Sequence, residues 1–122
     1  MMLKIRTLSW CLVLVVLSVV TTVAHMAFSK SIPEADAVLS ESPRQLQVWF
    51  TQAPDPVVSQ VTLKGSTGNV ELGGIMIHDD KSIMAMVPSV LSNGQYTVNW
   101  RAAGDDGHTQ RGNFVFTVTT GN

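Results

Sequence analysis

Beyond residue 31, apolar side chains recur at every second position in short runs that polar turns separate. Alternation of this kind places the apolar side chains on one face of a half-buried β-strand. No window after residue 24 keeps a 3.6-residue apolar period for three helical turns. We predict strands over residues 46–50, 58–63, 70–77, 83–87, 96–101 and 114–119. Short strands at this spacing predict one all-β domain, a small antiparallel barrel or sandwich.

The last two predicted strands supply the expected core. Their large alternating side chains are Tyr96, Val98, Trp100, Phe114, Phe116 and Val118. Each set of three shares one face of its strand. Such sets pack across neighbouring strands, so we expect them to fill the interior.

The first 24 residues have the features of a secretory signal peptide. Two basic residues precede an almost unbroken apolar run over residues 8–20, and small residues follow at 22–24. The run is shorter than the roughly 20 residues that cross a bilayer, which counts against a permanent anchor. We therefore predict that residues 1–24 are cleaved and that residues 25–122 form an exported domain.

The mature chain would contain no cysteine, because Cys11 lies within the signal. Disulfides could not stabilise it, so its roughly 98 residues must form a single hydrophobic core. Its six basic and nine acidic residues give a net charge near −3, which argues against nucleic acid or an anionic membrane as partner. No cysteine nucleophile or Ser-His-Asp motif is evident, so we expect no enzymatic activity. We also expect the protein to be a monomer.

Cleavage after Ala24 would make His25 the first residue of the mature chain. Its free α-amine and imidazole Nδ1 could then close a chelate ring on one metal ion. Groups of these two kinds have reference pKa values of about 7.7–8.0 and about 6.5, so both can lose a proton to a metal at neutral pH. Nitrogen ligands suit Cu(II), which heads the affinity order of divalent first-row ions. The alternative is that a cleavage site merely precedes a histidine.

A second pair of candidate ligands lies in the loop after the strand predicted over 96–101. Asp106 and His108 are two residues apart, so an extended backbone would direct both to the same side. Gly107 between them permits unusual φ values, and the carboxylate and imidazole could share one cation. The competing interpretation is a polar hairpin loop in which the aspartate caps a turn and the histidine lies in solvent. We assign the neighbouring Asp105 to solvent.

Seven short segments follow one another in an ordered set. They are His25 after the signal, residues 31–39 (Ser-Ile-Pro-Glu-Ala-Asp-Ala-Val-Leu), Ser42-Pro43, Val48-Trp49-Phe50-Thr51, residues 93–100 (Asn-Gly-Gln-Tyr-Thr-Val-Asn-Trp), Asp106-Gly107-His108 and residues 112–118 (Gly-Asn-Phe-Val-Phe-Thr-Val). Together they resemble the CopC family of periplasmic copper-resistance proteins, over nearly the whole mature chain.

The resemblance implies a small Greek-key β-barrel or sandwich, cupredoxin-like or immunoglobulin-like. It implies Cu(II) ligands at His25, Asp106 and His108. It also implies a periplasmic protein of copper resistance or homeostasis, which sequesters copper or passes it to a membrane partner. An inner-membrane copper transporter of the CopD type would be such a partner.

Two features depart from the family pattern. Gln52 stands where relatives commonly have a glutamate, and if that glutamate orients the amine or an imidazole, its loss could weaken or reshape the site. The dense Met-rich Cu(I) segment of some relatives is absent as well.

Methionines nevertheless gather around the turn over residues 79–82, and thioethers suit Cu(I). The residues concerned are Met76, His78, Met84 and Met86. If His78 pairs with Ile83, they divide between the two faces of a hairpin, whereas pairing with Ser82 places all four on one face. We favour the first register, because its four-residue loop is common and methionine is ordinary core filler.

Two other functions would use the same features. A copper-dependent oxidase of the N-terminal-histidine type would use the same chelate for oxygen chemistry, although about 98 residues leave little room for a substrate platform. A membrane-tethered β-sandwich interaction module would follow from a retained signal.

Overall fold

The computed structural model describes residues 16–19 and 25–121. Apart from residues 16–19, the predicted signal peptide lies outside the described residues, so its cleavage stays a prediction. Within the described ranges, no helix is long and apolar enough to cross a membrane.

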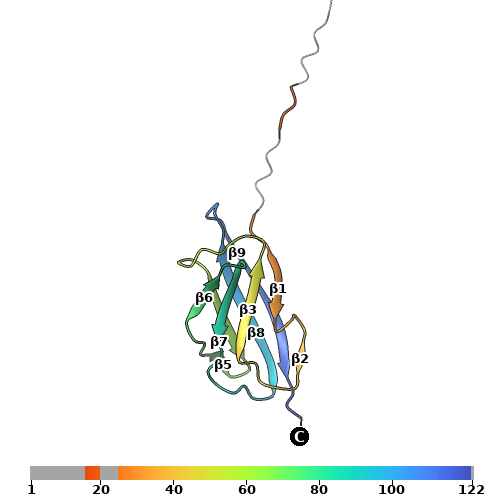
Figure 1. Cartoon of the computed structure of the whole chain (residues 1–122). Helices are drawn as coiled ribbons and strands as arrows, with labels where there is room; N and C mark the ends of the chain where they lie inside the picture. The colour runs from red at the N-terminus through yellow and green to blue at the C-terminus, as the bar shows by residue number, and fades with distance from the viewer. Residues whose placement is uncertain (1–15, 20–24, 122) are drawn as a thin grey trace, which may run out of the picture.

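Nine strands form two sheets in this part of the chain (Figure 1). One sheet has the order β1 (Phe28–Ile32), β3 (Gln45–Phe50), β7 (Ser82–Met86) and β6 (Ile75–His78). The other has the order β2 (Val38–Leu39), β9 (Thr109–Val118), β8 (Gly94–Ala103), β4 (Gln60–Gly65) and β5 (Gly68–Val70). Neighbouring strands are antiparallel except β2, which runs parallel to β9. The prediction of an all-β fold is confirmed.

Alternating residues of the long strands fill the core between the sheets. Every second residue of β3 is buried, as the period of two requires. Between β8 and β9, Tyr96 pairs with Phe116 and Val98 with Phe114. The rings of Tyr96 and Phe116 stack with centroids 5.6 Å apart. All six side chains that we expected in the core are buried, so that prediction is confirmed.

Trp100 fills space that a glycine leaves open. Its partner on β9 is Gly112, where a Cβ would lie 2.7 Å from Cε2 and 3.0 Å from Nε1 of the indole. The indole also stacks on Phe28 at 6.1 Å and meets Phe50 edge-on at 5.1 Å. Trp100 therefore connects β8 and β9 to the strand that begins three residues after His25.

The single strand predicted over residues 70–77 is wrong. The chain forms β5 and β6 there, and these belong to different sheets. Gly73 and Gly74 lie between them, and the backbone N–H of Gly73 donates to the carbonyl of Met86 at 2.8 Å. A run of apolar residues does not record a change of sheet, and the glycine pair is its local sign. Strands β1 and β2 have no counterpart among the predicted strands.

The hairpin of β6 and β7 adopts the second of the two registers considered above. His78 pairs with Ser82, and Lys81 in the turn has a φ of 67°. The favoured pairing of His78 with Ile83 is wrong, because it would divide the β-branched residues between two faces. In the observed register the residues facing the core are Ile75, Ile77, Ile83 and Ala85.

Candidate metal centre

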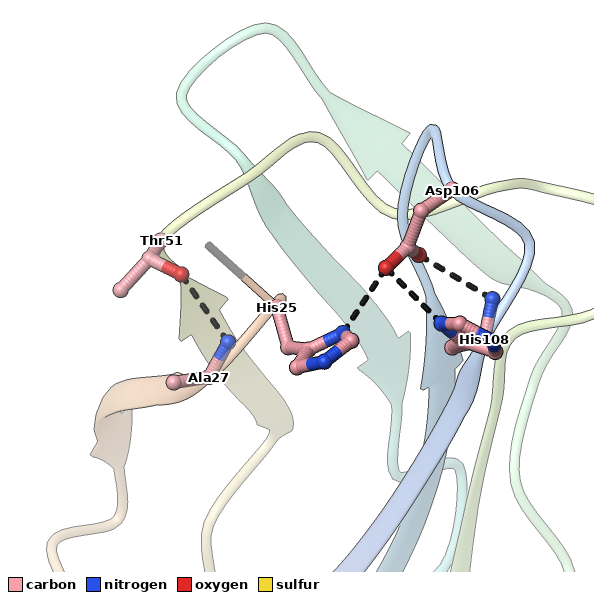
Figure 2. Close-up of polar contacts among 5 residues, drawn as sticks. All are labelled: His25, Ala27, Thr51, Asp106 and His108. Atoms are coloured by element: carbon pink, nitrogen blue, oxygen red, sulfur yellow. Dashed lines mark hydrogen bonds and ion pairs between the residues drawn. The ribbon is translucent and has the colours of Figure 1, made fainter. Parts of the chain in front are cut away.

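Contacts just after His25 hold the start of the domain in place. Met26 is buried in the core with 3% of its surface exposed. The backbone N–H of Ala27 donates to Thr51 Oγ1 at 2.9 Å, and the Thr51 N–H donates to the Ala27 carbonyl at 2.9 Å (Figure 2). These contacts join the chain to the end of β3 and leave the exposed His25 beside the loop between β8 and β9.

That loop, residues 104–108, is a tight turn rather than an extended segment. The N–H of Gly107 donates to the carbonyl of Gly104 at 3.1 Å, and Gly107 has a φ of 75°, which glycine adopts readily. Asp106 Oδ1 accepts the backbone N–H of His108 at 3.1 Å, the pattern of an Asx-turn. Asp106 and His108 therefore meet through a turn, and the extended backbone assumed from the sequence is wrong. The turn-capping aspartate considered as the alternative is present.

One carboxylate oxygen joins the two histidines. His25 Nδ1 lies 2.9 Å and His108 Nδ1 lies 3.1 Å from Asp106 Oδ2 (Figure 2). The two imidazole rings are 5.2 Å apart between centroids and tilted by 63°. One ligand atom from each of the three residues lies within 4.8 Å of the other two. The three residues named from the sequence are thus brought together.

The electrostatics favour a charged carboxylate at the centre of this group. The hydrogen bond from His25, followed by that from the His108 backbone N–H, lowers the pKa of Asp106, and partial burial opposes the shift. The Asp106 side chain is 18% exposed, whereas the His25 and His108 side chains are 55% and 69% exposed. A shielded anion therefore lies between two accessible imidazoles, an arrangement suited to a cation that arrives from solvent.

Three other residues shape the site. Thr51 and Met26 fix the direction of His25, but neither residue is assigned to the site from the sequence. Thr51 does lie in one of the segments quoted for the family resemblance. Gln52 lies against the start of the loop over residues 104–108, since a Cβ on Gly104 would overlap its Oε1. Asp105 is exposed and does not belong to the group of three.

Comparison with known proteins identifies the family. A family model described as the CopC domain matches residues 28–119. The chain belongs to the CopC family. The crystal structure of CopC from Methylosinus trichosporium OB3b is similar with a TM-score of 0.73 and 26% identity, covering 80% of this chain and 97% of that one.

Two proteins of Escherichia coli are also similar. PcoC, described as a methionine-rich copper resistance protein, matches with a TM-score of 0.71 and 29% identity, over 79% of this chain and all of PcoC. Protein YobA of strain K12 is 25% identical over 118 residues, which cover 93% of this chain and 95% of YobA. The family match and these similarities support a function connected with copper.

Proposed function

We propose that the mature chain is a periplasmic protein that binds Cu(II) through His25, Asp106 and His108. The observation that carries the proposal is the approach of both Nδ1 atoms to the single oxygen Asp106 Oδ2, at 2.9 and 3.1 Å. Two imidazoles and a carboxylate offer two nitrogens and one oxygen, a set that suits Cu(II).

Proton displacement is the chemical step of binding. A neutral imidazole that donates Nδ1–H to a carboxylate has its second nitrogen free, and a shift of tautomer moves the proton there. The two Nδ1 atoms and Asp106 Oδ2 can then share one cation in place of two protons. Cleavage after Ala24 adds the α-amine of His25, which closes a six-membered ring with Nδ1.

Copper is the cargo of this protein and not the cofactor of a reaction. We infer that the chain sequesters Cu(II) or passes it to a membrane partner, such as a copper transporter of the CopD type. The exposed imidazoles of His25 and His108 support transfer, because a partner can reach ligands that are more than half exposed.

A copper titration of the mature protein tests the proposal. Mass spectrometry of the exported chain first establishes whether it begins at His25. We expect one equivalent of Cu(II) to give an EPR spectrum with nitrogen couplings, and His108→Ala to remove one of them. Asp106→Asn should weaken binding, whereas the matched variant Asp105→Asn, in the same turn, should not.

Two results would contradict the proposal. One is an EPR spectrum that is identical in the native protein and in His108→Ala. The other is equal loss of affinity in Asp105→Asn and Asp106→Asn, which would indicate a general charge effect of the loop. Peroxide production with ascorbate far above that of free copper would favour the oxidase instead.

A further inference from the structure

The outer face of the five-stranded sheet carries basic residues and no acidic ones. Lys64, Arg101 and Arg111 lie on this face, on β4, β8 and β9. They are half of the six basic residues of the mature chain, whereas none of its nine acidic residues lies in the strands of this sheet that the structure describes. The domain is acidic as a whole, so this face has a charge opposite in sign to that of the rest of the molecule.

The two arginines are direct neighbours across β8 and β9. Arg101 pairs with Arg111 in the ladder, and side chains in such positions have Cβ atoms about 4.5–5.5 Å apart. Like charges directly opposite each other destabilise a sheet. Within residues 16–19 and 25–121 neither guanidinium belongs to an ion pair, since the pairs found there join only Asp106 to His25 and His108. The described part of the chain therefore provides no anion that would offset the charge of the two arginines.

A cavity of about 400 Å³ lies between the arginines and the neighbouring pair of residues on the same face, Asn99 and Asn113. The pair between them is Trp100 with Gly112, and the Trp100 side chain is buried in the core. Because side chains alternate between the faces of a sheet, the backbone of this middle pair forms the floor of the cavity. Six polar side chains surround the floor: Gln60, Thr62, Asn99, Arg101, Arg111 and Asn113.

One guanidinium is fixed in direction, and the other can adjust. Arg101 is half-buried, and its Nε donates to the backbone carbonyl of Val58 at 3.0 Å. Its two terminal NH₂ groups supply further donors in a planar arrangement. Arg111 is exposed, so its side chain can turn toward a ligand. The pair thus combines an oriented donor group with an adaptable one, which suits a planar anion such as a carboxylate.

We propose that this cavity is a docking site for an acidic segment of a partner protein, whose carboxylates bind Arg101 and Arg111. Arginine binds carboxylates through two parallel hydrogen bonds. The carboxamides of Gln60, Asn99 and Asn113 each offer donors and an acceptor, as a peptide group does, so they suit the backbone of the same segment. Three basic residues on a domain with a net charge near −3 are too few for a nucleic acid or an anionic membrane.

The docking site lies close to the candidate metal centre. From the arginines the ladder continues by two further pairs to Ala103 and Thr109, a length of about 7 Å at the usual rise of a strand. The loop that carries Asp106 and His108 follows directly. A partner bound at the arginines would therefore lie beside this loop. A use of the docking site in copper transfer rests on the proposed function, whereas the binding of an acidic segment does not.

NMR of the metal-free mature protein tests the docking site. The probe is a short blocked peptide in which glutamate alternates with serine, and the control peptide has glutamine in place of glutamate. We expect the glutamate peptide to shift the Nε–Hε signals of Arg101 and Arg111 and the side-chain amides of Asn99 and Asn113. The control peptide should leave these signals in place. Addition of about 0.5 M NaCl should weaken binding of the glutamate peptide, because salt screens exposed charges.

Matched variants distinguish this site from a general attraction of charges. Arg111→Gln should weaken binding of the glutamate peptide by at least about threefold. Arg44→Gln should bind as the native protein does, although it removes the same charge, because Arg44 lies just before β3 in the other sheet. Arg111→Gln should melt no earlier than the native protein, since it removes a repulsion between like charges. Its Cu(II) EPR spectrum should stay unchanged, so failure of the docking site and failure of the metal centre are separate results.

Three outcomes would overturn the proposal. The first is an equal loss of peptide affinity in Arg44→Gln and Arg111→Gln. The second is equal binding of the glutamate and glutamine peptides, which would show that the site does not recognise carboxylates. The third is binding of citrate or inorganic phosphate with the affinity of the glutamate peptide and with shifts at the same side chains. That result would indicate a site for small free anions instead of a protein segment.

Discussion

Gly112→Ala should destabilise the domain although it adds a single methyl group. Gly112 pairs with Trp100 across β8 and β9, and its Cβ would lie 2.7 Å from indole Cε2 and closer still to Cζ2. These atoms belong to the body of a rigid ring, which cannot turn aside as the end of a flexible chain could. The ring is also confined, since Phe28 stacks on it and Phe50 meets it edge-on.

The magnitude follows from overpacking. A methyl group forced into a closely packed core costs about 1–3 kcal/mol. For a domain of about 98 residues each kcal/mol corresponds to about 4–8 °C, so we expect the melting temperature to fall by about 5–20 °C. Because Trp100 contacts Phe28, the displaced ring should also disturb the segment after His25 and weaken Cu(II) binding.

Calorimetry of the mature protein measures the effect, and Gly74→Ala is the matched control. At Gly74 a Cβ would meet nothing within 4 Å, so that variant should stay within about 0.5 kcal/mol of the native protein or gain slightly. Equal melting temperatures for Gly112→Ala and the native protein would refute the reasoning, because the indole would then have room to move. A comparable loss in Gly74→Ala would show that the backbone conformation of glycine, and not the indole, governs both positions.

Three further results are expected. Hydrogen bonds from Ser82 and Trp49 lower the pKa of Asp80 below its ordinary value of 3.8. The stability that the charged Asp80 contributes is therefore complete above pH 3.8 and is lost as the pH falls through the lower pKa of the folded state. Urea unfolding between pH 7 and pH 3 should show a smaller loss of stability toward acid pH in Asp80→Asn than in the native protein. The Tyr96 hydroxyl donates to a backbone carbonyl at 2.7 Å, so Tyr96→Phe should cost about 1 kcal/mol in the same assay. Hydrogen bonds from His25 and from the His108 backbone N–H lower the pKa of Asp106 below its ordinary value of 3.8, so the carboxylate stays charged in mild acid. Copper titrations at pH 7 and pH 5 should therefore show that Asp106→Asn weakens Cu(II) binding by a similar factor at both.

The sequence predicts those strands in which every second side chain is apolar and is buried in the structure. Residues of β8 and β9 alternate cleanly, and their core sets meet across the strands as expected. The segment over 70–77 lacks such a signal, because β5 and β6 are short and in different sheets. In the β6–β7 hairpin a preference for loop length was outweighed by burial of the isoleucines, a tertiary effect that local sequence does not record.

The candidate site is likewise predicted only in part by the sequence. The sequence offers its three residues as candidates, through the chelating chemistry of His25 and the spacing of Asp106 and His108, and the resemblance to the CopC family selects them as ligands. Their geometry does not follow from the sequence, since an Asx-turn around Gly107 replaces the extended backbone. The contact that sets the direction of His25 joins residues 24 positions apart, and a distant contact of this kind is invisible to a local pattern.

The tether after His25 leads to a last prediction about processing. Because Met26 is buried and Ala27 makes hydrogen bonds to Thr51, the position of His25 is set by residues that follow it in the chain. Cleavage after Ala24 would therefore add a ligand without having to move the imidazole. A chain that retains Ala24 should still bind Cu(II), but more weakly and with one nitrogen coupling fewer than the chain that begins at His25. Identical EPR spectra and affinities for the two chains would mean that the α-amine is not a ligand, and the chelate at His25 would have to be abandoned.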